Sequence, residues 1–150
     1  MRKPKSIVKK LIIVVIICGI FLFSDWLLSD RNIIKGYYKA EEYFDPFPTQ
    51  DSVDYCKYYY TEEYDSIFLN KYRKVTDENR EEIKKYFSNF KEWMDAGDRL
   101  DEYDFTEDII DNNDFYLLSE NPTGYKKFEY YTIHFYDTNN HILYYVHANL

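Results

Sequence analysis

The sequence predicts an α+β protein: an N-terminal transmembrane helix, then a small exported domain in which one long amphipathic helix packs on a three-stranded antiparallel meander. Three observations support this prediction. An uncharged apolar run stands near the N-terminus, residues 77–96 repeat apolar side chains at helical spacing, and the residues after 113 alternate between apolar and polar side chains. A chain of 150 residues has room for one domain of ordinary size.

The membrane prediction rests on the run from Leu11 to Phe23, LIIVVIICGIFLF, which contains no charge. With its flanks, the window of residues 7–28 is long enough to cross a hydrocarbon core about 30 Å thick. Trp26 follows the run where an interfacial aromatic residue belongs. A cleaved signal peptide is the alternative, but the small residues that cleavage requires are missing around Ser24 and Ser29. We therefore favour an uncleaved signal anchor.

Charge is divided unevenly along the chain. The first ten residues hold five of the 19 Lys and Arg residues and none of the 27 Asp and Glu residues, while the whole chain has a formal net charge of −8. Positive charge beside a membrane span stays in the cytoplasm, so residues 1–10 are predicted to be a cytoplasmic basic segment and the C-terminal domain to lie outside. The acidic exported part repels phosphate backbones, which argues against nucleic-acid binding.

Residues 30–50 are predicted to form a juxtamembrane helix and a proline-containing linker, and residues 51–150 the folded extracytoplasmic α+β domain. The segment from Asn32 to Phe44 places apolar side chains on one helical stripe, and this helix could continue from the anchor through Gly36. The Asp45-Pro46-Phe47-Pro48 stretch should end it, because proline disfavours helix at the preceding residue.

The first part of the domain is ambiguous. Asp51 to Tyr64 suits either a short helix, capped by Asp51 or Ser52, or a strand rich in tyrosine, and we prefer the helix. Ile67 to Val75 is expected to be extended, or partly so.

The clearest helix runs from Asp77 to Ala96. Thr76 or Asp77 can cap its start, and Gly97 is placed to end it. Its apolar stripe consists of Ile83, Phe87, Phe90 and Met94, widened by Tyr86 and Trp93. Such a stripe is typical of a helix that packs on a sheet.

An acidic stretch follows, from Asp95 to Asp114. Calcium is one interpretation, but Asp98, Asp101 and Asp104 are spaced by threes, and the loop of an EF-hand needs alternate ligands and a central glycine. A solvated surface is the preferred interpretation.

Three strands are predicted at the C-terminus: Asp114 to Glu120, Phe128 to Asp137 and His141 to Ala148. A turn at Asn121-Pro122-Thr123-Gly124 separates the first two. A two-residue turn at Asn139-Asn140, or a four-residue loop with the same pairing, separates the last two.

This register decides what the histidines can do. Thr132 faces His147 and His134 faces Tyr145, so the apolar residues Tyr131, Ile133, Phe135, Ile142, Tyr144 and Val146 form the core face. The opposite, outer face carries Thr132, His134, Tyr136, His141, Leu143, Tyr145 and His147. His134 and His147 are diagonal neighbours about 7–8 Å apart, whereas His141 is about 20 Å from His147. A three-histidine metal site is excluded, and His134 with His147 and a borrowed carboxylate remains a candidate metal site.

The sequence lacks the motifs of other common enzyme chemistries. The sequence contains no G-x-S-x-G, no H-E-x-x-H and no glycine-rich phosphate loop, so no catalytic residue and no cofactor is predicted. Cys18 lies in the anchor and Cys56 in the exported part, so they cannot pair within one chain. Cys56 could link two chains or be a partly buried thiol among tyrosines.

The leading functional interpretation is a non-enzymatic, membrane-anchored module that binds an envelope protein, a peptide or a cell-wall component. Tyr136 and Tyr145 on the outer hairpin face are its candidate binding residues, because tyrosine is amphipathic, unless another segment covers that face. The alternatives are a cell-envelope enzyme that uses carboxylates or a His-assisted metal, and a toxin-immunity membrane protein whose acidity suits a cationic partner.

The C-terminal HFYDTNNHILYYVHANL, together with KYRKVTDENREEIKKYFSNFKEWM and EYDF, resembles uncharacterised small single-span membrane-anchored proteins of Gram-positive bacteria. The resemblance covers most of the exported domain. It implies a bacterial origin and an extracytoplasmic domain, and it transfers no functional residue.

Overall fold

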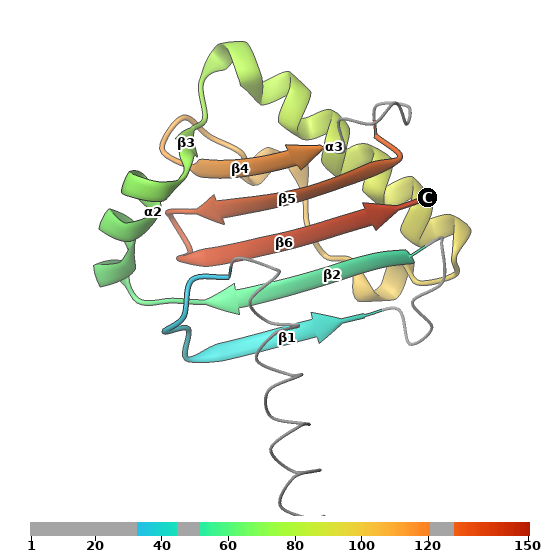
Figure 1. Ribbon diagram of the computed structural model, residues 1–150, viewed down its shortest axis with the longest axis horizontal. Coiled ribbons are helices and arrows are strands. Elements are labelled where there is room, and N and C mark those ends of the chain that lie inside the picture. The colour runs from blue at the N-terminus through green and yellow to red at the C-terminus, as the bar shows by residue number, and fades with distance from the viewer. Residues whose placement is uncertain (1–32, 45–51, 121–127) are drawn as a thin grey trace, which may run out of the picture. The chain divides into compact units, whose positions relative to one another are not determined.

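The computed structural model describes residues 33–44, 52–120 and 128–150. The chain divides into two units, Met1–Lys35 and Gly36–Leu150, and the fold below is that of the second (Figure 1). Its elements in chain order are β1 (Lys39–Tyr43), β2 (Ser52–Tyr59), the 3₁₀ turn η1 (Glu62–Tyr64), α2 (Asp65–Lys71), β3 (Arg73–Lys74), α3 (Asp77–Ala96), the 3₁₀ turns η2 (Leu100–Glu102) and η3 (Glu107–Ile109), β4 (Phe115–Glu120), β5 (Tyr130–Asp137) and β6 (Ile142–Asn149).

Several predictions lie outside the described residues: the basic segment at 1–10, the anchor at 7–28, the two prolines of the linker and the turn at 121–124. Within the three described ranges, no helix has the length and apolarity that a membrane crossing requires.

The domain is α+β and is built on one six-stranded antiparallel sheet in the order β1-β2-β6-β5-β4-β3 (Figure 1). The three C-terminal strands that the sequence predicts are observed as β4, β5 and β6. The predicted three-stranded meander is wrong as a description of the whole sheet, because β2 pairs with β6 over its full length and β1 and β3 add the two edges. Of these added strands, β2 is rich in tyrosine, and aromatic side chains suit a pleated, half-buried surface.

The predicted helix from Asn32 to Phe44 is wrong, because residues 39–43 form the edge strand β1. Gly36 adopts φ +115°, a left-handed conformation that a helix cannot contain, so no helix passes through this residue. The preference for a helix after Asp51 is wrong as well, because Ser52–Tyr59 is strand β2. Across these two strands Tyr43 stacks on Tyr55, with ring centroids 6.3 Å apart.

The extended segment predicted at Ile67 to Val75 is correct only for Arg73–Lys74, because Asp65–Lys71 is helix α2. Phe68 of α2 and Tyr72, the residue after the helix, lie four residues apart. Their rings therefore lie on the same side, with centroids 5.2 Å apart. Both side chains are buried against the sheet. Phe68 also stacks on Tyr136 of β5, so a contact far away in the sequence stabilises this helix.

The predicted helix at 77–96 is confirmed as α3. Thr76 caps its start: the Thr76 side chain accepts from the backbone N–H of Asn79, and the Asn79 Oδ1 accepts from the Thr76 N–H at 2.9 Å. The buried residues are those of the predicted stripe, namely Ile83, Tyr86, Phe87, Phe90 and Met94. Trp93 is the exception, since 37% of it is exposed.

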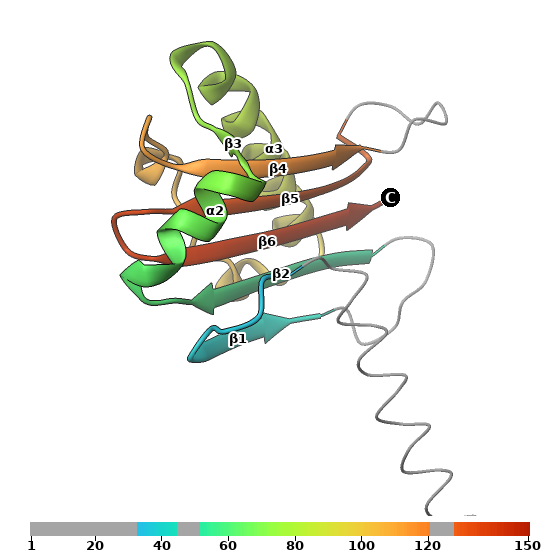
Figure 2. The ribbon, with the colours of Figure 1, turned by 60° about the vertical axis from the view of Figure 1, so that its left-hand side comes forward.

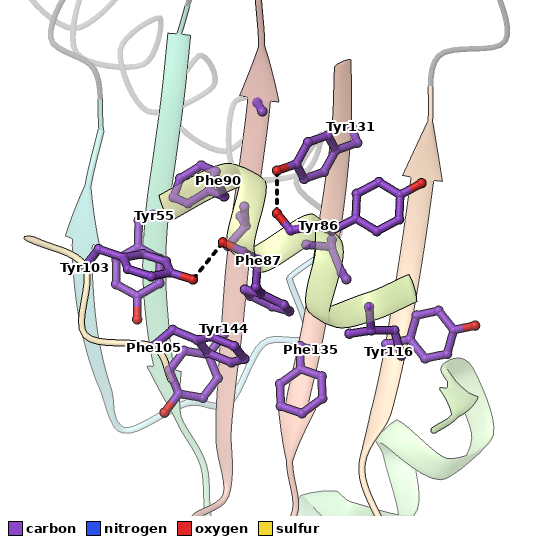
Figure 3. Packing of buried hydrophobic residues seen from close by; sticks show 14 of the residues in the cluster. Tyr55, Tyr86, Phe87, Phe90, Tyr103, Phe105, Tyr116, Tyr131, Phe135 and Tyr144 are labelled. Atoms are coloured by element: carbon purple, nitrogen blue, oxygen red, sulfur yellow. Dashed lines mark hydrogen bonds between the residues drawn. The ribbon is translucent and has the colours of Figure 1, made fainter. Parts of the chain in front are cut away.

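Helices cover the two faces of the sheet, α3 on one side and α2 on the other (Figure 2). The α3 side holds the main core, where Phe87 of α3 stacks on Phe105 at a centroid distance of 3.8 Å (Figure 3). Two buried tyrosines also reach the backbone of α3: Tyr131 Oη donates to the Tyr86 carbonyl at 2.8 Å, and Tyr103 Oη donates to the Phe87 carbonyl at 3.2 Å (Figure 3).

Tyrosine takes the place of phenylalanine where a ring reaches an acid at the rim of the core. Tyr55 Oη donates to Asp104 at 2.6 Å, and Tyr58 Oη donates to Glu42 at 2.8 Å. Tyr86 donates to Glu120 in the same manner. Burial raises the pKa of each of these tyrosines, and the acceptor carboxylate raises it further. The ring is buried while the hydroxyl is satisfied, which connects the high tyrosine content with the acidic composition.

Cys56 lies in the middle of β2. Its register partners are Glu42 of β1 and Tyr145 of β6, and its side chain is fully buried. The interpretation of a buried thiol among tyrosines therefore describes its surroundings, whereas a disulfide between two chains would need the thiol at the surface.

Candidate functional site

The β5–β6 hairpin has the register that the sequence predicts. His134 pairs with Tyr145, and the last pair is Asp137 with Ile142, so residues 138–141 form a four-residue loop with the pairing of a two-residue turn. The predicted core face is confirmed, because its residues belong to the α3-side core, with Ile142 partly buried: Tyr131, Ile133, Phe135, Ile142, Tyr144 and Val146.

The tip of this hairpin meets α2 in a cluster of three polar side chains. His141, which ends the loop with φ 55°, places its Nδ1 3.1 Å from Oδ1 of Asp65 at the start of α2. Tyr136 Oη donates to the same Asp65 Oδ1 at 2.5 Å and lies 3.4 Å from His141 Nδ1. A histidine that carries its proton on Nδ1 donates it to Asp65 in this arrangement.

The second ring nitrogen of His141 is the free one. No described residue bonds to Nε2, and 29% of the His141 side chain is exposed. A carboxylate at Nδ1 and an Nε2 without a described partner form the arrangement by which a histidine accepts a proton or binds a metal with its orientation fixed. We call Asp65, His141 and Tyr136 the hairpin-tip cluster.

Tyr136 is fully buried, so another segment covers this candidate binding residue, and its role in binding stays a prediction. Phe68 of α2 stacks on it with ring centroids 3.7 Å apart, and the ring of Tyr60 meets its edge at 6.2 Å. Burial raises the Tyr136 pKa, and the bond to Asp65 raises it further. Only the hydroxyl reaches the hairpin-tip cluster, so a direct contact of this ring with a partner would require α2 to move.

Tyr145 and His134 are also buried, each with 4% exposed. Their rings lie side by side across the two strands at 5.2 Å, and Tyr72 lies 5.9 Å from His134. The predicted outer face is thus a second buried layer at these positions. A role of Tyr145 in binding stays a prediction.

His147 is a diagonal neighbour of His134, as predicted, and its Nδ1 lies 3.0 Å from the hydroxyl of Thr132. In the three described ranges, no three His, Cys, Asp or Glu side chains come close enough together to hold a metal ion. Metal binding by His134 and His147 stays a prediction, without a described carboxylate to complete the site.

Sequence reasoning missed a charged cluster on the α3 side of the sheet. Lys57 of β2 is almost fully buried, and its Nζ lies 2.5 Å from Asp104 and 2.5 Å from Glu41. Tyr55 Oη also donates to Asp104. The available signal was the alternation of Val53, Tyr55 and Lys57, which places the lysine on a core-facing position.

Each charged group of this cluster stabilises the ionised form of its partners. Burial lowers the pKa of Lys57, but the hydrogen bonds to Asp104 and Glu41 outweigh it and raise the pKa overall. Hydrogen bonds from Lys39 and Lys57 lower the pKa of Glu41 to about 2. The lysine is therefore held protonated, which suits an ion pair and not a nucleophile.

Comparisons with protein-family models, with curated proteins and with solved structures gave no match. Two arrangements of the described residues can support chemistry or binding. The hairpin-tip cluster can transfer a proton at His141 Nε2, and the exposed charges of the surface can bind a partner of opposite sign.

Proposed function

We propose that the chain is a non-enzymatic, membrane-anchored module whose extracytoplasmic domain binds a cationic protein or peptide of the cell envelope. The observation behind this proposal is a group of exposed acids in the segment from the end of α3 to the start of β4. This group, the acidic loop, consists of Asp95, Asp98, Asp101, Glu107 and Asp108.

The acidic loop is held on a rigid support. Tyr103 and Phe105, in the middle of the segment, are buried against α3 and the sheet (Figure 3). The exposed acids stand on either side of these two anchors. Their positions are fixed before a partner arrives, which lowers the entropy cost of binding.

The charge of the acidic loop is uncompensated. The neighbouring Glu102 pairs with Arg99, and Asp104 pairs with Lys57. The five acids of the loop form no ion pair with a described residue. Uncompensated negative charge attracts a cationic partner and raises its rate of association.

Membrane anchoring is supported by the sequence of the N-terminal part: the apolar run at 11–23, the basic residues before it and the acidic domain after it. This topology brings the acidic loop to envelope proteins, peptides and wall components outside the cell. A toxin-immunity role is the special case in which the cationic partner is a toxin.

The test uses the full chain in membranes and poly-lysine as the probe. The triple variant Asp98→Asn, Asp101→Asn and Asp108→Asn should weaken poly-lysine binding by about tenfold or more. Asparagine suits Asp98 in particular, because this residue has φ 56°, a conformation that asparagine tolerates.

The matched control removes three exposed acids elsewhere: Glu62→Gln, Glu78→Gln and Glu81→Gln. An equal loss of poly-lysine binding in both triple variants would show that net charge alone acts, and would contradict the assignment of the acidic loop. Crosslinking from intact membranes with the wild type and the two variants then identifies the natural partner.

A second candidate function is a cell-envelope enzyme, and the hairpin-tip cluster favours it. His141 backed by Asp65 can act as a general base through Nε2. Under this function, His141→Gln abolishes turnover of an envelope substrate while poly-lysine binding persists. Under the first proposal, the same variant leaves partner binding unchanged.

A further inference from the structure

The sheet face on the α2 side changes character along its strands. Near the hairpin tip α2 crosses this face, and Tyr136 and Tyr145 of the face are buried (Figure 2). At the other end of the strands, toward the C-terminus of β6, side chains of the same face are partly or fully exposed. We call these residues the polar patch: Asp54, Ser119, Tyr130, Thr132, His147 and Asn149.

The strand register places one row of the polar patch across four strands. Asp54 of β2 is directly opposite His147 of β6, and Thr132 of β5 is directly opposite His147 on its other side. Ser119 of β4 is opposite Thr132 and extends the row. Side chains directly opposite each other in an antiparallel sheet project from the same face. The row is therefore continuous, and it is about 14 Å long at about 4.8 Å between neighbouring strands.

Tyr130 and Asn149 form the adjoining row, because they are directly opposite each other. Each lies two positions from a member of the first row, so the alternation along a strand places both on the same face. Two contacts tie the patch together. His147 Nδ1 lies 3.0 Å from the Thr132 hydroxyl, and the rings of Tyr130 and His147 meet edge to face at 5.9 Å. These side chains are thus neighbours in space, held on rigid strands.

The composition of the polar patch differs from that of a merely solvated surface. Asp54 is its only permanent charge, although 31% of the residues of the chain are charged. Aspartate and asparagine are disfavoured in strands, yet Asp54 and Asn149 lie in β2 and β6, which both have a strand on each side. Strand propensity does not account for these residues. Their hydrogen-bonding groups point instead to a ligand that is polar and uncharged.

We propose that the polar patch binds an uncharged glycan of hexose or N-acetylhexosamine units. Sugar hydroxyls both donate and accept hydrogen bonds, as do the hydroxyls of Ser119 and Thr132 and the amide of Asn149. Tyr130 is 36% exposed and offers a ring on which the apolar C–H face of a sugar packs. Asp54 accepts hydrogen bonds from sugar hydroxyls and repels anionic polymers. The row is longer than a single sugar ring, so an oligosaccharide suits it better than a monosaccharide.

The polar patch is distinct from the acidic loop. The loop is anchored by Tyr103 and Phe105 in the core on the α3 side, whereas the patch lies on the opposite face of the sheet. Glycan binding therefore goes beyond the proposed function and does not depend on it. A domain with both sites can hold a cationic partner and a glycan at the same time.

The experiment uses the full chain in phosphatidylcholine nanodiscs. The probes are hexamers of N-acetylglucosamine, of glucose and of galacturonic acid, and saturation-transfer difference NMR detects their binding even when it is weak. We expect at least one of the two uncharged hexamers to bind and the anionic hexamer not to bind. The proposal is overturned if neither uncharged hexamer binds, or if galacturonic acid hexamer binds as tightly as they do.

Substitutions locate the binding site. Tyr130→Ala should weaken binding of the uncharged hexamer by about fivefold or more, and Thr132→Val by about threefold. The matched controls are Tyr38→Ala, at the opposite end of β2, and Thr61→Val, which both change exposed residues and should leave binding unchanged. Near-ultraviolet circular dichroism verifies that each variant folds. Equal losses in the patch variants and in the controls would contradict the assignment of the patch.

The triple variant of the acidic loop separates the two proposals. It should bind the uncharged hexamer as the wild type does, even though it loses poly-lysine binding. Loss of hexamer binding in this variant would contradict the independence of the two sites. Failure of poly-lysine binding in the wild type would contradict the acidic loop alone.

Discussion

Phe68 and Tyr136 stack face to face, with ring centroids 3.7 Å apart and ring planes inclined by 10°. This contact is the main attachment of α2 to the sheet, since both rings are fully buried. It also positions Asp65, one turn earlier on α2, to accept the Tyr136 hydroxyl. The hairpin-tip cluster therefore depends on a stacked pair that has no charge of its own.

Phe68→Ala should lower the free energy of unfolding by about 3–5 kcal/mol, the usual cost of removing a buried phenylalanine. The chemical shift of the Tyr136 ring should change at the same time. Urea denaturation of the full chain in detergent measures the first effect. Leu69→Ala, on the exposed side of the same helix, is the control and should change the free energy by less than about 0.5 kcal/mol.

Gly36→Ala should destabilise the domain by about 2 kcal/mol or more. Its φ of +115° disfavours any side chain, and an added Cβ would collide with the ring and hydroxyl of Tyr64. Thermal unfolding measures the loss. Gly97→Ala should differ by about 1 kcal/mol at most, because Gly97 has an ordinary φ of −86° and the nearest atom lies at 3.4 Å. Similar losses in both variants would contradict this explanation.

The stability of the domain should depend on Asp114 between about pH 4 and pH 7. Burial, together with the nearby carboxylates of Asp111 and Asp137, raises the Asp114 pKa to about 6, while bonds donated by backbone N–H groups oppose this rise. The folded state holds this proton more tightly than the unfolded state. The stabilisation from protonated Asp114 is therefore complete below about pH 4, and it is lost as the pH rises through about 6. The loss amounts to about 3 kcal/mol at the most.

Urea denaturation at several pH values, compared between wild type and Asp114→Asn, isolates this contribution. The variant loses one acceptor for the Asp111 N–H but cannot ionise, so the difference in the pH slope of the unfolding free energy is the decisive quantity. Parallel curves for the two proteins would contradict the raised pKa.

Lys57→Met should raise the pKa of Glu41 from about 2 toward its usual range, although Lys39 still holds it below. Methionine retains the apolar stem, so the change removes mainly the charge. Asp104 and Glu41 are 61% and 25% exposed and can be rehydrated, so we expect a loss of about 1–2 kcal/mol. A carboxylate NMR titration follows Glu41. Lys84→Met, which breaks only the surface pair with Glu81, should leave the Glu41 pKa unchanged.

The sequence predicts α3 and the strands β4, β5 and β6 because each has a clear period, and the β5–β6 register follows from one alternation. It fails for β1 and β2, where tyrosine suits a helix stripe and a strand equally well. The pairing of β2 with β6, and of β1 with β2, decides in favour of strands. It fails for α2 because the reason for that helix, the stack of Phe68 on Tyr136, joins distant parts of the chain.

The candidate site was predictable only in part. The separation of His141 from His134 and His147 follows from strand geometry, and the structure agrees. The partner of His141 could not be predicted, because Asp65 is 76 positions away and no local pattern marks it. Likewise, the burial of Tyr136 and Tyr145 depends on how chain segments cover the second face, which hairpin alternation does not reveal.

Because Cys56 is buried, the reactivity of its thiol measures how often the sheet opens locally. A maleimide reagent cannot reach this thiol in the closed sheet, so its labelling rate reports how often the middle of β2 becomes accessible. In a Cys18→Ser background, Cys56 is the single thiol of the chain. The same labelling reaction, run with and without a bound partner, measures whether partner binding lowers the rate at which Cys56 becomes accessible.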